Sequence, residues 1–247
     1  MCGIAGVVDW RQPGDADAVG RMVKRLTHRG PNHGAVVARG PAILGHRRLA
    51  ILDLSLEANQ PMADTGRRVW IVFNGEIYNY RELRADLASR NVRFRTQSDT
   101  EVLLEAYKHW GAACVERLNG MFAFALWDEP NQRLLLARDR LGEKPLYYAW
   151  LPTGGLVFAS ELKALRLYPG IGNRISPAAL SQYLSLNYIL HTDCMLEGVH
   201  KLPPGHVLLA ESGRPAHPLP YWNLARHFRE KSRSEEHTSE LQSRFGI

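Results

Sequence analysis

Cys2 follows the initiator Met1 directly, so removal of one residue would place a thiol and a free α-amino group on the same amino acid. A thiol attacks as its thiolate, and a free cysteine has a pKa of about 8.5. An α-amino group has a pKa of about 7.7–8.0, so near neutral pH part of it can accept the thiol proton, directly or through water. We expect Met1 to be removed because the next side chain is small. The stretch thus predicts an N-terminal nucleophile, although a strand that simply begins with a small residue fits it equally well when it is taken alone.

The stretch MCGIAG at residues 1–6 is followed by six further motifs whose order and spacing are specific, although each is weak alone. They are HRGPN at 28–32, GHRRLAILD at 45–53, FNGEIYNY at 73–80, SDTE at 98–101, GMFAFALWD at 120–128 and RDRLGEKPLYY at 138–148. Over residues 1–223 the series resembles the class II glutamine amidotransferase domain, and most of all the N-terminal half of glutamine-dependent asparagine synthetases. The sister branches, glucosamine-phosphate synthases and phosphoribosylpyrophosphate amidotransferases, usually carry a His-Thr-Arg motif in place of GHRRLAILD.

The resemblance implies catalytic roles for three residues. Cys2 would attack the side-chain amide carbon of glutamine, which puts negative charge on the carbonyl oxygen. Asn74, through its side-chain NH₂, and Gly75, through its backbone N–H, would form the oxyanion hole for that charge. Taken alone, an Asn-Gly pair would favour a hairpin turn.

The resemblance also implies how glutamine is bound. Arg48 would bind the α-carboxylate, because a guanidinium fork matches a carboxylate in a bidentate manner. Its neighbour Arg47 should face the other way in a strand. Asp99 would pair with the α-ammonium group with help from Glu76, although an acid at this position also suits the first turn of a helix. Four consecutive residues are expected to line the pocket with their backbone: Leu49, Ala50, Ile51 and Leu52.

The HRGP motif at residues 28–31 is predicted to be architectural and to pack beneath the strand that carries the nucleophile. The family usually has Asp directly after it, where this chain has Asn32. This difference affects one local charge contact and none of the roles assigned above.

Short apolar runs between turn residues predict many strands that are separated from runs of helices, which favours an α+β fold over an alternating parallel one. Strands are expected at 2–10, 42–54, 69–75, 121–128, 133–139, 145–150, 155–160 and 202–210, and helices at 17–26, 80–90, 100–110 and 177–187. The resemblance implies a four-layer αββα sandwich of two stacked, mostly antiparallel sheets, the fold of N-terminal-nucleophile hydrolases.

Composition argues against several other classes of protein. The chain has 247 residues, a net charge of +6 and 45% hydrophobic residues. No apolar run approaches the roughly 20 residues that span a bilayer. No secretory signal pattern opens the chain, and its basic residues form no block typical of nucleic-acid binding. The three cysteines lie far apart and no histidines have ligand spacing. We therefore expect a cytoplasmic protein without a metal site, a membrane anchor or a nucleic-acid partner.

Residues 1–224 are expected to form the amidotransferase domain, and residues 225–247 the start of a linker and a disordered tail. The last stretch, RSEEHTSELQSRFGI at 233–247, resembles a translated sequencing-library adapter, so we expect it to be foreign to the natural protein. The chain has no Ser-Gly-Gly-x-Asp-Ser loop, so the ATP-binding synthetase domain of the resembling enzymes is missing. No cofactor is expected for this chain, whereas ATP and Mg²⁺ would serve only the missing domain.

The resemblance implies that L-glutamine is hydrolysed through a Cys2 thioester to glutamate and ammonia, and that the missing synthetase domain passes the ammonia to β-aspartyl-AMP. Two alternatives stay open. The acceptor could be another carboxylate, of a sugar or a small metabolite, because the motifs GEKPLYY and LPPGH fit both. The chain could also be an inactive truncated fragment. Glutamine and the missing domain are the expected partners, and a homodimer is a further possibility.

Overall fold

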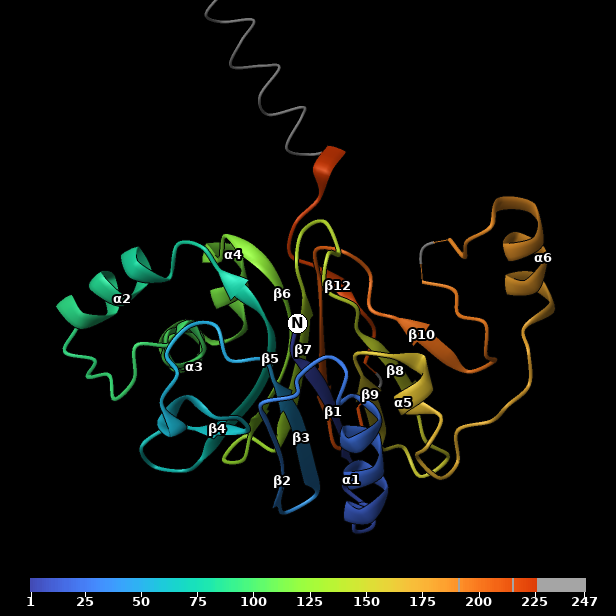
Figure 1. Cartoon of the computed structure of the whole chain (residues 1–247), viewed down its shortest axis with the longest axis horizontal. Helices are drawn as coiled ribbons and strands as arrows, with labels where there is room; N and C mark the ends of the chain where they lie inside the picture. Colours follow the sequence, from blue (N-terminus) through green and yellow to red (C-terminus); the bar gives the residue numbers. More distant parts are fainter. Residues whose placement is uncertain (191, 215, 226–247) are drawn as a thin grey trace, which may run out of the picture.

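The computed structural model describes residues 1–190, 192–214 and 216–225, and these form two six-stranded sheets (Figure 1). The predicted adapter-like tail at 233–247 and nearly all of the predicted linker lie outside the described residues. Every strand pair within the described residues is antiparallel. The predicted α+β class with two antiparallel sheets is therefore confirmed.

The first sheet has the strand order β10-β8-β9-β1-β3-β2. Its strands are β1 (Gly3–Val8), β2 (His33–Arg39), β3 (Ala42–Arg48), β8 (Tyr147–Trp150), β9 (Leu156–Ala159) and β10 (Val199–Lys201). The second sheet has the order β12-β11-β7-β6-β5-β4. Its strands are β4 (Met62–Ala63), β5 (Val69–Ile77), β6 (Gly120–Asp128), β7 (Arg133–Arg138), β11 (His206–Glu211) and β12 (Leu219–Pro220).

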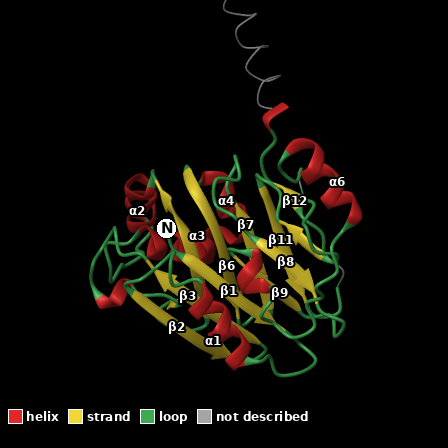
Figure 2. Ribbon diagram, turned by 45° about the vertical axis from the view of Figure 1, so that its right-hand side comes forward, coloured by secondary structure: helices red, strands yellow, loops and turns green. Residues whose placement is uncertain are grey.

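Helices cover the outer face of each sheet, which completes the four layers (Figure 2). The helices α1 (Ala16–Arg25) and α5 (Leu162–Leu165) pack on the first sheet. The helices α2 (Tyr80–Ser89), α3 (Asp99–Trp110) and α4 (Cys114–Arg117) pack on the second. The helix α6 (Pro177–Leu186) projects from the side of the molecule (Figure 1), and 3₁₀ turns occur at Leu56–Ala58 and Gly111–Ala113.

An apolar cluster fills the space between the two sheets, and within it Phe158, Trp127 and Leu44 are almost fully buried. On β1, Ile4 and Val8 face this inner layer, whereas Ala5 and Val7 face α1. A strand that is covered on both faces needs apolar residues at every position. This explains why the opening stretch of the chain is continuously apolar instead of alternating.

The structure can be compared with the sequence predictions at several elements. The strand expected at 42–54 ends at Arg48, because the following residues form a loop that folds back on the Arg48 side chain. Asn74 and Gly75 lie inside β5, paired with Ala123 and Phe122, which agrees with the strand predicted at 69–75 and not with the turn that the Asn-Gly pair would favour alone. The edge strand β2 was not expected, and its residues alternate between partly buried and exposed, with none fully buried.

Replacement of Phe158 with alanine should lower the free energy of unfolding by about 3–5 kcal/mol, because it opens a cavity between the two sheets. The expected result is a lower urea midpoint with an unchanged slope. Leu184→Ala is the matched control, since Leu184 is 73% exposed on α6, and it should shift stability by no more than about 0.5 kcal/mol. Equal stability of the two variants would contradict this packing.

Candidate active site

The site lies where the inward-facing rows of three strands change from apolar to polar. Side chains alternate along a strand, so Cys2 continues the inward row of Ile4. In the same way Arg48 continues the row of Leu44 on β3, and Asn74 continues the row of Val72 on β5. The neighbouring sheets therefore bring three residues that are far apart in sequence to one end of the inter-sheet space.

A cavity of about 110 Å³ occupies this end. Nine of the ten predicted site residues line it: Cys2, Arg48, Leu49, Ile51, Leu52, Asn74, Gly75, Glu76 and Asp99. Ala50 is not among the lining residues, and its N–H instead donates to Oδ1 of Asn32 at 3.0 Å. The substitution noted in the sequence, Asn32, therefore holds the loop that follows β3.

The Cys2 thiol is held between the backbone groups of one residue. Its Sγ accepts from the N–H of Leu49 at 3.4 Å and lies 3.7 Å from the Leu49 carbonyl oxygen. Burial raises the pKa of the Cys2 thiol, and this outweighs the opposite effects of the Leu49 N–H and of the positive N-terminus. In this structure Met1 is still attached, so the nitrogen of Cys2 is an amide and cannot act as a base. Met1 lines the cavity, and its Sδ lies 3.7 Å from Nζ of Lys144.

The backbone of Cys2 is fixed by the HRGP motif, as the sequence predicted. The Arg29 guanidinium donates through Nε to the Cys2 carbonyl at 2.8 Å and pairs through Nη1 with Glu161 at 2.9 Å. Burial of Glu161 opposes its charged form, but hydrogen bonds from Arg29, His28 and Lys163 outweigh it and lower the pKa of Glu161 to about 2. Glu161 therefore carries a charge at neutral pH, and the pair it forms anchors the nucleophile.

Asn74 presents a hydrogen-bond donor to the cavity. Its side chain is 1% exposed, and Nδ2 has no partner among the described residues. A buried unpaired amide costs about 1–3 kcal/mol of stability, so its retention indicates a functional purpose. Gly75 comes next on the strand, where an added Cβ would lie 2.2 Å from the Met121 carbonyl oxygen. Only glycine lets β5 approach β6 so closely at this point.

Arg48 is almost fully buried and folds the loop that borders the cavity. Its Nη1 donates to the Ser55 carbonyl at 2.8 Å and to Asn59 Oδ1 at 2.7 Å. Its Nη2 donates to the carbonyl oxygens of Leu52 and Asp53. Both terminal nitrogens are therefore engaged with the loop in this structure. Arg47 points away, toward the Gly30 carbonyl at 2.8 Å, as the strand alternation predicted.

Asp99 begins α3 on the opposite side of the cavity and is 5% exposed. Its Oδ2 accepts from the N–H of Ile77 at 3.0 Å. Burial raises the pKa of Asp99 to about 6, against the effect of backbone hydrogen bonds, and the nearby charge of Glu76 raises it further. The residue is both a helix N-terminal acid and a carboxylate that lines the cavity, and its pairing with an ammonium group stays a prediction.

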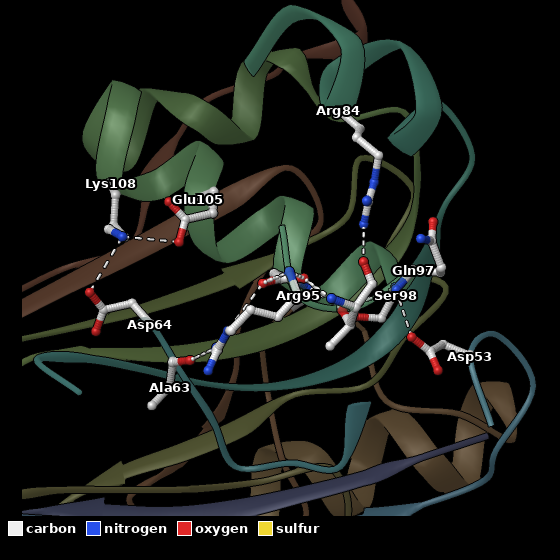
Figure 3. Close-up of polar contacts among 11 residues, drawn as sticks. Asp53, Ala63, Asp64, Arg84, Arg95, Gln97, Ser98, Glu105 and Lys108 are labelled. Carbon is white, nitrogen blue, oxygen red and sulfur yellow. Dashed lines mark hydrogen bonds and ion pairs between the residues drawn. The ribbon is translucent and has the colours of Figure 1, made fainter. Parts of the chain in front are cut away.

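The buried carboxylate of Glu101 holds the segment that leads into α3 through hydrogen bonds to its backbone. Glu101, 2% exposed, accepts from the backbone N–H groups of Arg95 and Thr96. The neighbouring backbone N–H of Gln97 donates to Asp53 Oδ2 at 2.6 Å, a bond drawn as a dashed line in Figure 3. The loop after β3 and the start of α3, which border the cavity from two sides, are thereby tied together.

Residues 1–222 match the family described as glutamine amidotransferase domain. The chain belongs to this family. The amidotransferase domain is 37% identical over 244 residues to asparagine synthetase (glutamine-hydrolyzing) 3 of Bacillus subtilis, an alignment that covers 96% of this chain and 38% of that protein. It is 35% identical over 260 residues to amidase chry2 of Gibberella zeae, with 97% of this chain and 37% of that protein covered. The chain thus spans less than two fifths of the length of either relative.

A solved structure with the same fold is the glutamine phosphoribosylpyrophosphate amidotransferase of Bacillus subtilis. The amidotransferase domain superposes on it with a TM-score of 0.66 at 20% sequence identity, over 90% of this chain and 49% of that one. At this level of identity the match concerns the fold alone, and it confirms the predicted N-terminal-nucleophile sandwich.

Several cavity residues were not assigned from the sequence. Phe73, Ser98, Thr100, Met121 and Lys144 also line the cavity, and all five lie within the quoted motifs. Ala58 and Gln60 line it as well, but they lie outside every motif, in a stretch that gave no sequence signal.

The described residues contain neither a grouped set of metal-ligating side chains nor a membrane-spanning helix. Among residues 1–190, 192–214 and 216–225, no three or more His, Cys, Asp or Glu side chains are grouped so as to hold a metal ion. Over the same part of the chain, no helix is long and apolar enough to cross a bilayer.

In protein that retains Met1, Cys2 should react with iodoacetamide at pH 7 several-fold more slowly than free cysteine, because its raised pKa leaves little thiolate. The rate should keep rising with pH beyond the usual range of a thiol, as measured by mass spectrometry of the N-terminal peptide. Cys114 is the internal control, since burial raises its pKa to about 12 and it should stay unmodified. Alkylation of Cys2 at the rate of free cysteine at pH 7 would contradict this.

Proposed function

We propose that this amidotransferase domain is the glutaminase half of an asparagine synthetase and that its mature nucleophile is Cys2. The observation that carries the proposal is one cavity that holds a thiol, an unpaired amide donor and a buried carboxylate. Residues 1–224 form the proposed domain, and its substrate is L-glutamine.

The proposed reaction begins once Met1 has been removed. The neutral α-amino group of Cys2 takes the thiol proton, and the sulfur attacks the side-chain amide carbon of glutamine. Negative charge develops on the carbonyl oxygen, where the side chain of Asn74 and the backbone N–H of Gly75 stabilise it. The protonated amine then gives its proton to the leaving nitrogen, and ammonia departs. Water attacks the resulting thioester, which releases glutamate and restores the thiol.

Binding of the amino-acid end of glutamine is proposed to use both charged sides of the cavity. Asp99, with Glu76 beside it, pairs with the α-ammonium group. Arg48 pairs with the α-carboxylate and shares or exchanges the bonds that it makes to the loop. Three of the four residues that follow Arg48 border the substrate there, which are Leu49, Ile51 and Leu52, whereas Ala50 is turned toward Asn32.

The acceptor of the ammonia is proposed to be aspartate, activated by ATP with Mg²⁺ on a synthetase domain that follows in the full-length protein. The name of the Bacillus subtilis relative supports this choice. A second candidate acceptor is a carboxylate other than that of aspartate. It is supported by the relative named amidase chry2, whose name does not specify asparagine synthesis. We propose the cytoplasm as the location, because the reaction draws on glutamine, aspartate and ATP, and a homodimer as an assembly to be tested by sedimentation.

Purified protein that has lost Met1 should hydrolyse L-glutamine, and Cys2→Ala should abolish glutamate release because no nucleophile remains. Asn74→Ala should lower kcat by about 10²–10³-fold through loss of one oxyanion donor. Cys194→Ala is the control and should keep full activity, since Cys194 does not line the cavity. Full activity of Cys2→Ala would refute the assignment, and a cooperatively melting wild type without activity would favour the inactive-fragment alternative.

Glutamine binding should weaken about tenfold per pH unit below pH 6, because the carboxyl of Asp99, with a pKa of about 6, becomes neutral there and loses its attraction for the α-ammonium group. The measurement is calorimetry on Cys2→Ala protein, in which no turnover interferes. Asp99→Asn in that background should bind weakly at every pH, with no inflection near 6. Asp17→Asn, an acid in the first turn of α1, is the control and should keep the profile.

A further inference from the structure

The strand β5, which carries Asn74, is no longer paired with β4 where it approaches the cavity. β4 pairs with β5 only at Trp70 and Ile71, while β5 continues to Ile77. At Phe73 the edge of the second sheet would therefore be open on the side away from β6. Unpaired backbone groups at such a buried edge are costly, so another partner is needed there.

Two side chains take the place of the missing strand at Phe73. Gln60 Oε1 accepts from the Phe73 N–H at 2.6 Å. His46 Nε2 lies 3.1 Å from the Phe73 carbonyl oxygen. Burial lowers the pKa of His46 to about 3, so its ring is neutral at pH 7, and Nε2 must carry the proton because a carbonyl can only accept. Both backbone polar groups of Phe73, the residue directly before Asn74, are thus held by side chains.

Gln60 makes a second bond from the other end of its amide. Its Nε2 donates to Thr100 Oγ1 at 3.2 Å, and Thr100 directly follows Asp99. The Gln60 side chain is 6% exposed and lines the cavity. One amide group therefore joins the residue before the proposed oxyanion donor to the residue after the proposed ammonium-binding carboxylate.

We propose that Gln60 is a positioning residue that fixes the distance between Asn74 and Asp99, so that one glutamine molecule can reach both. The inference rests on the proposed function and assigns it a residue outside every sequence motif.

A second tie explains why Gln60 is needed. Asp99 Oδ2 accepts from the N–H of Ile77, which joins α3 to the far end of β5. Gln60 adds a second bond at the near end, at Phe73, and the two bonds bracket the strand segment 74–76. The amide supplies the acceptor for the Phe73 N–H and the donor for Thr100 from one uncharged group.

The test uses Gln60→Met, which keeps the chain length and removes the amide, and Thr100→Val, which removes only the tie to α3. Gln60→Met should lower kcat for glutamine at least about tenfold and raise KM, because both ends of the site shift. Thr100→Val should raise KM about tenfold with kcat within about twofold. The double variant should raise KM no more than Gln60→Met does, because the two residues share one bond.

Two controls separate positioning from loss of the fold. Alkylation of mature Cys2 by iodoacetamide needs neither Asn74 nor Asp99, so its rate should stay within about twofold in every variant. Gln12→Leu, at an exposed glutamine, should keep wild-type kcat and KM. Wild-type kinetics in Gln60→Met, or independent effects of the two substitutions on KM, would overturn the role of Gln60 while leaving the glutaminase assignment intact. A wild type that does not hydrolyse glutamine would overturn both.

Discussion

Burial of the first strand is the constraint on which the rest of the structure depends. β1 lies between β3 and β9 in the middle of its sheet, and all six of its residues are buried. It is held further by the Ser160 side chain, which accepts from the N–H of Ile4 at 3.0 Å. A terminal strand usually frays, but one in this position cannot move without opening both the inter-sheet core and the layer under α1. The beginning of the chain is thereby as fixed as its centre.

Charge around the cavity is stabilised by protein groups in place of water. Carbonyl oxygens of the loop after β3 accept hydrogen bonds from Arg48, and Glu161 forms an ion pair with Arg29. The charge of Asp99 is stabilised by backbone N–H groups such as that of Ile77. This last arrangement is the least favourable, and the raised pKa of Asp99 reflects it. A ligand that carries a positive charge to Asp99 would offset that desolvation, which is the role proposed for the α-ammonium group of glutamine.

Residues that lie within motifs or apolar runs could be predicted from the sequence, whereas those fixed only by tertiary contacts could not. Cys2, Arg48, Asn74 and Asp99 were found because the order of the motifs specifies them, and the structure brings them to one cavity. The loop after Arg48 reads as a continuing strand because Leu49, Ile51 and Leu54 are apolar, yet the guanidinium of Arg48 folds it away. Asn74-Gly75 resembles a turn locally, but pairing with β6 overrides that preference. The role of Gln60 could not be predicted, because this glutamine lies in no motif. Its role depends on a tertiary feature, the end of β4 before it reaches Phe73 of β5.

Met1, which lines the cavity next to Lys144, has a consequence for the timing of the proposed activity. In a newly synthesised polypeptide Met1 borders the cavity, and its peptide bond to Cys2 leaves the Cys2 nitrogen unable to accept the thiol proton. One cleavage by an aminopeptidase would remove Met1 from the border of the cavity and at the same time free the α-amino group of Cys2, which is the proposed base. Ammonia, which is harmful when released without an acceptor, would then be produced only by chains that have completed this maturation step.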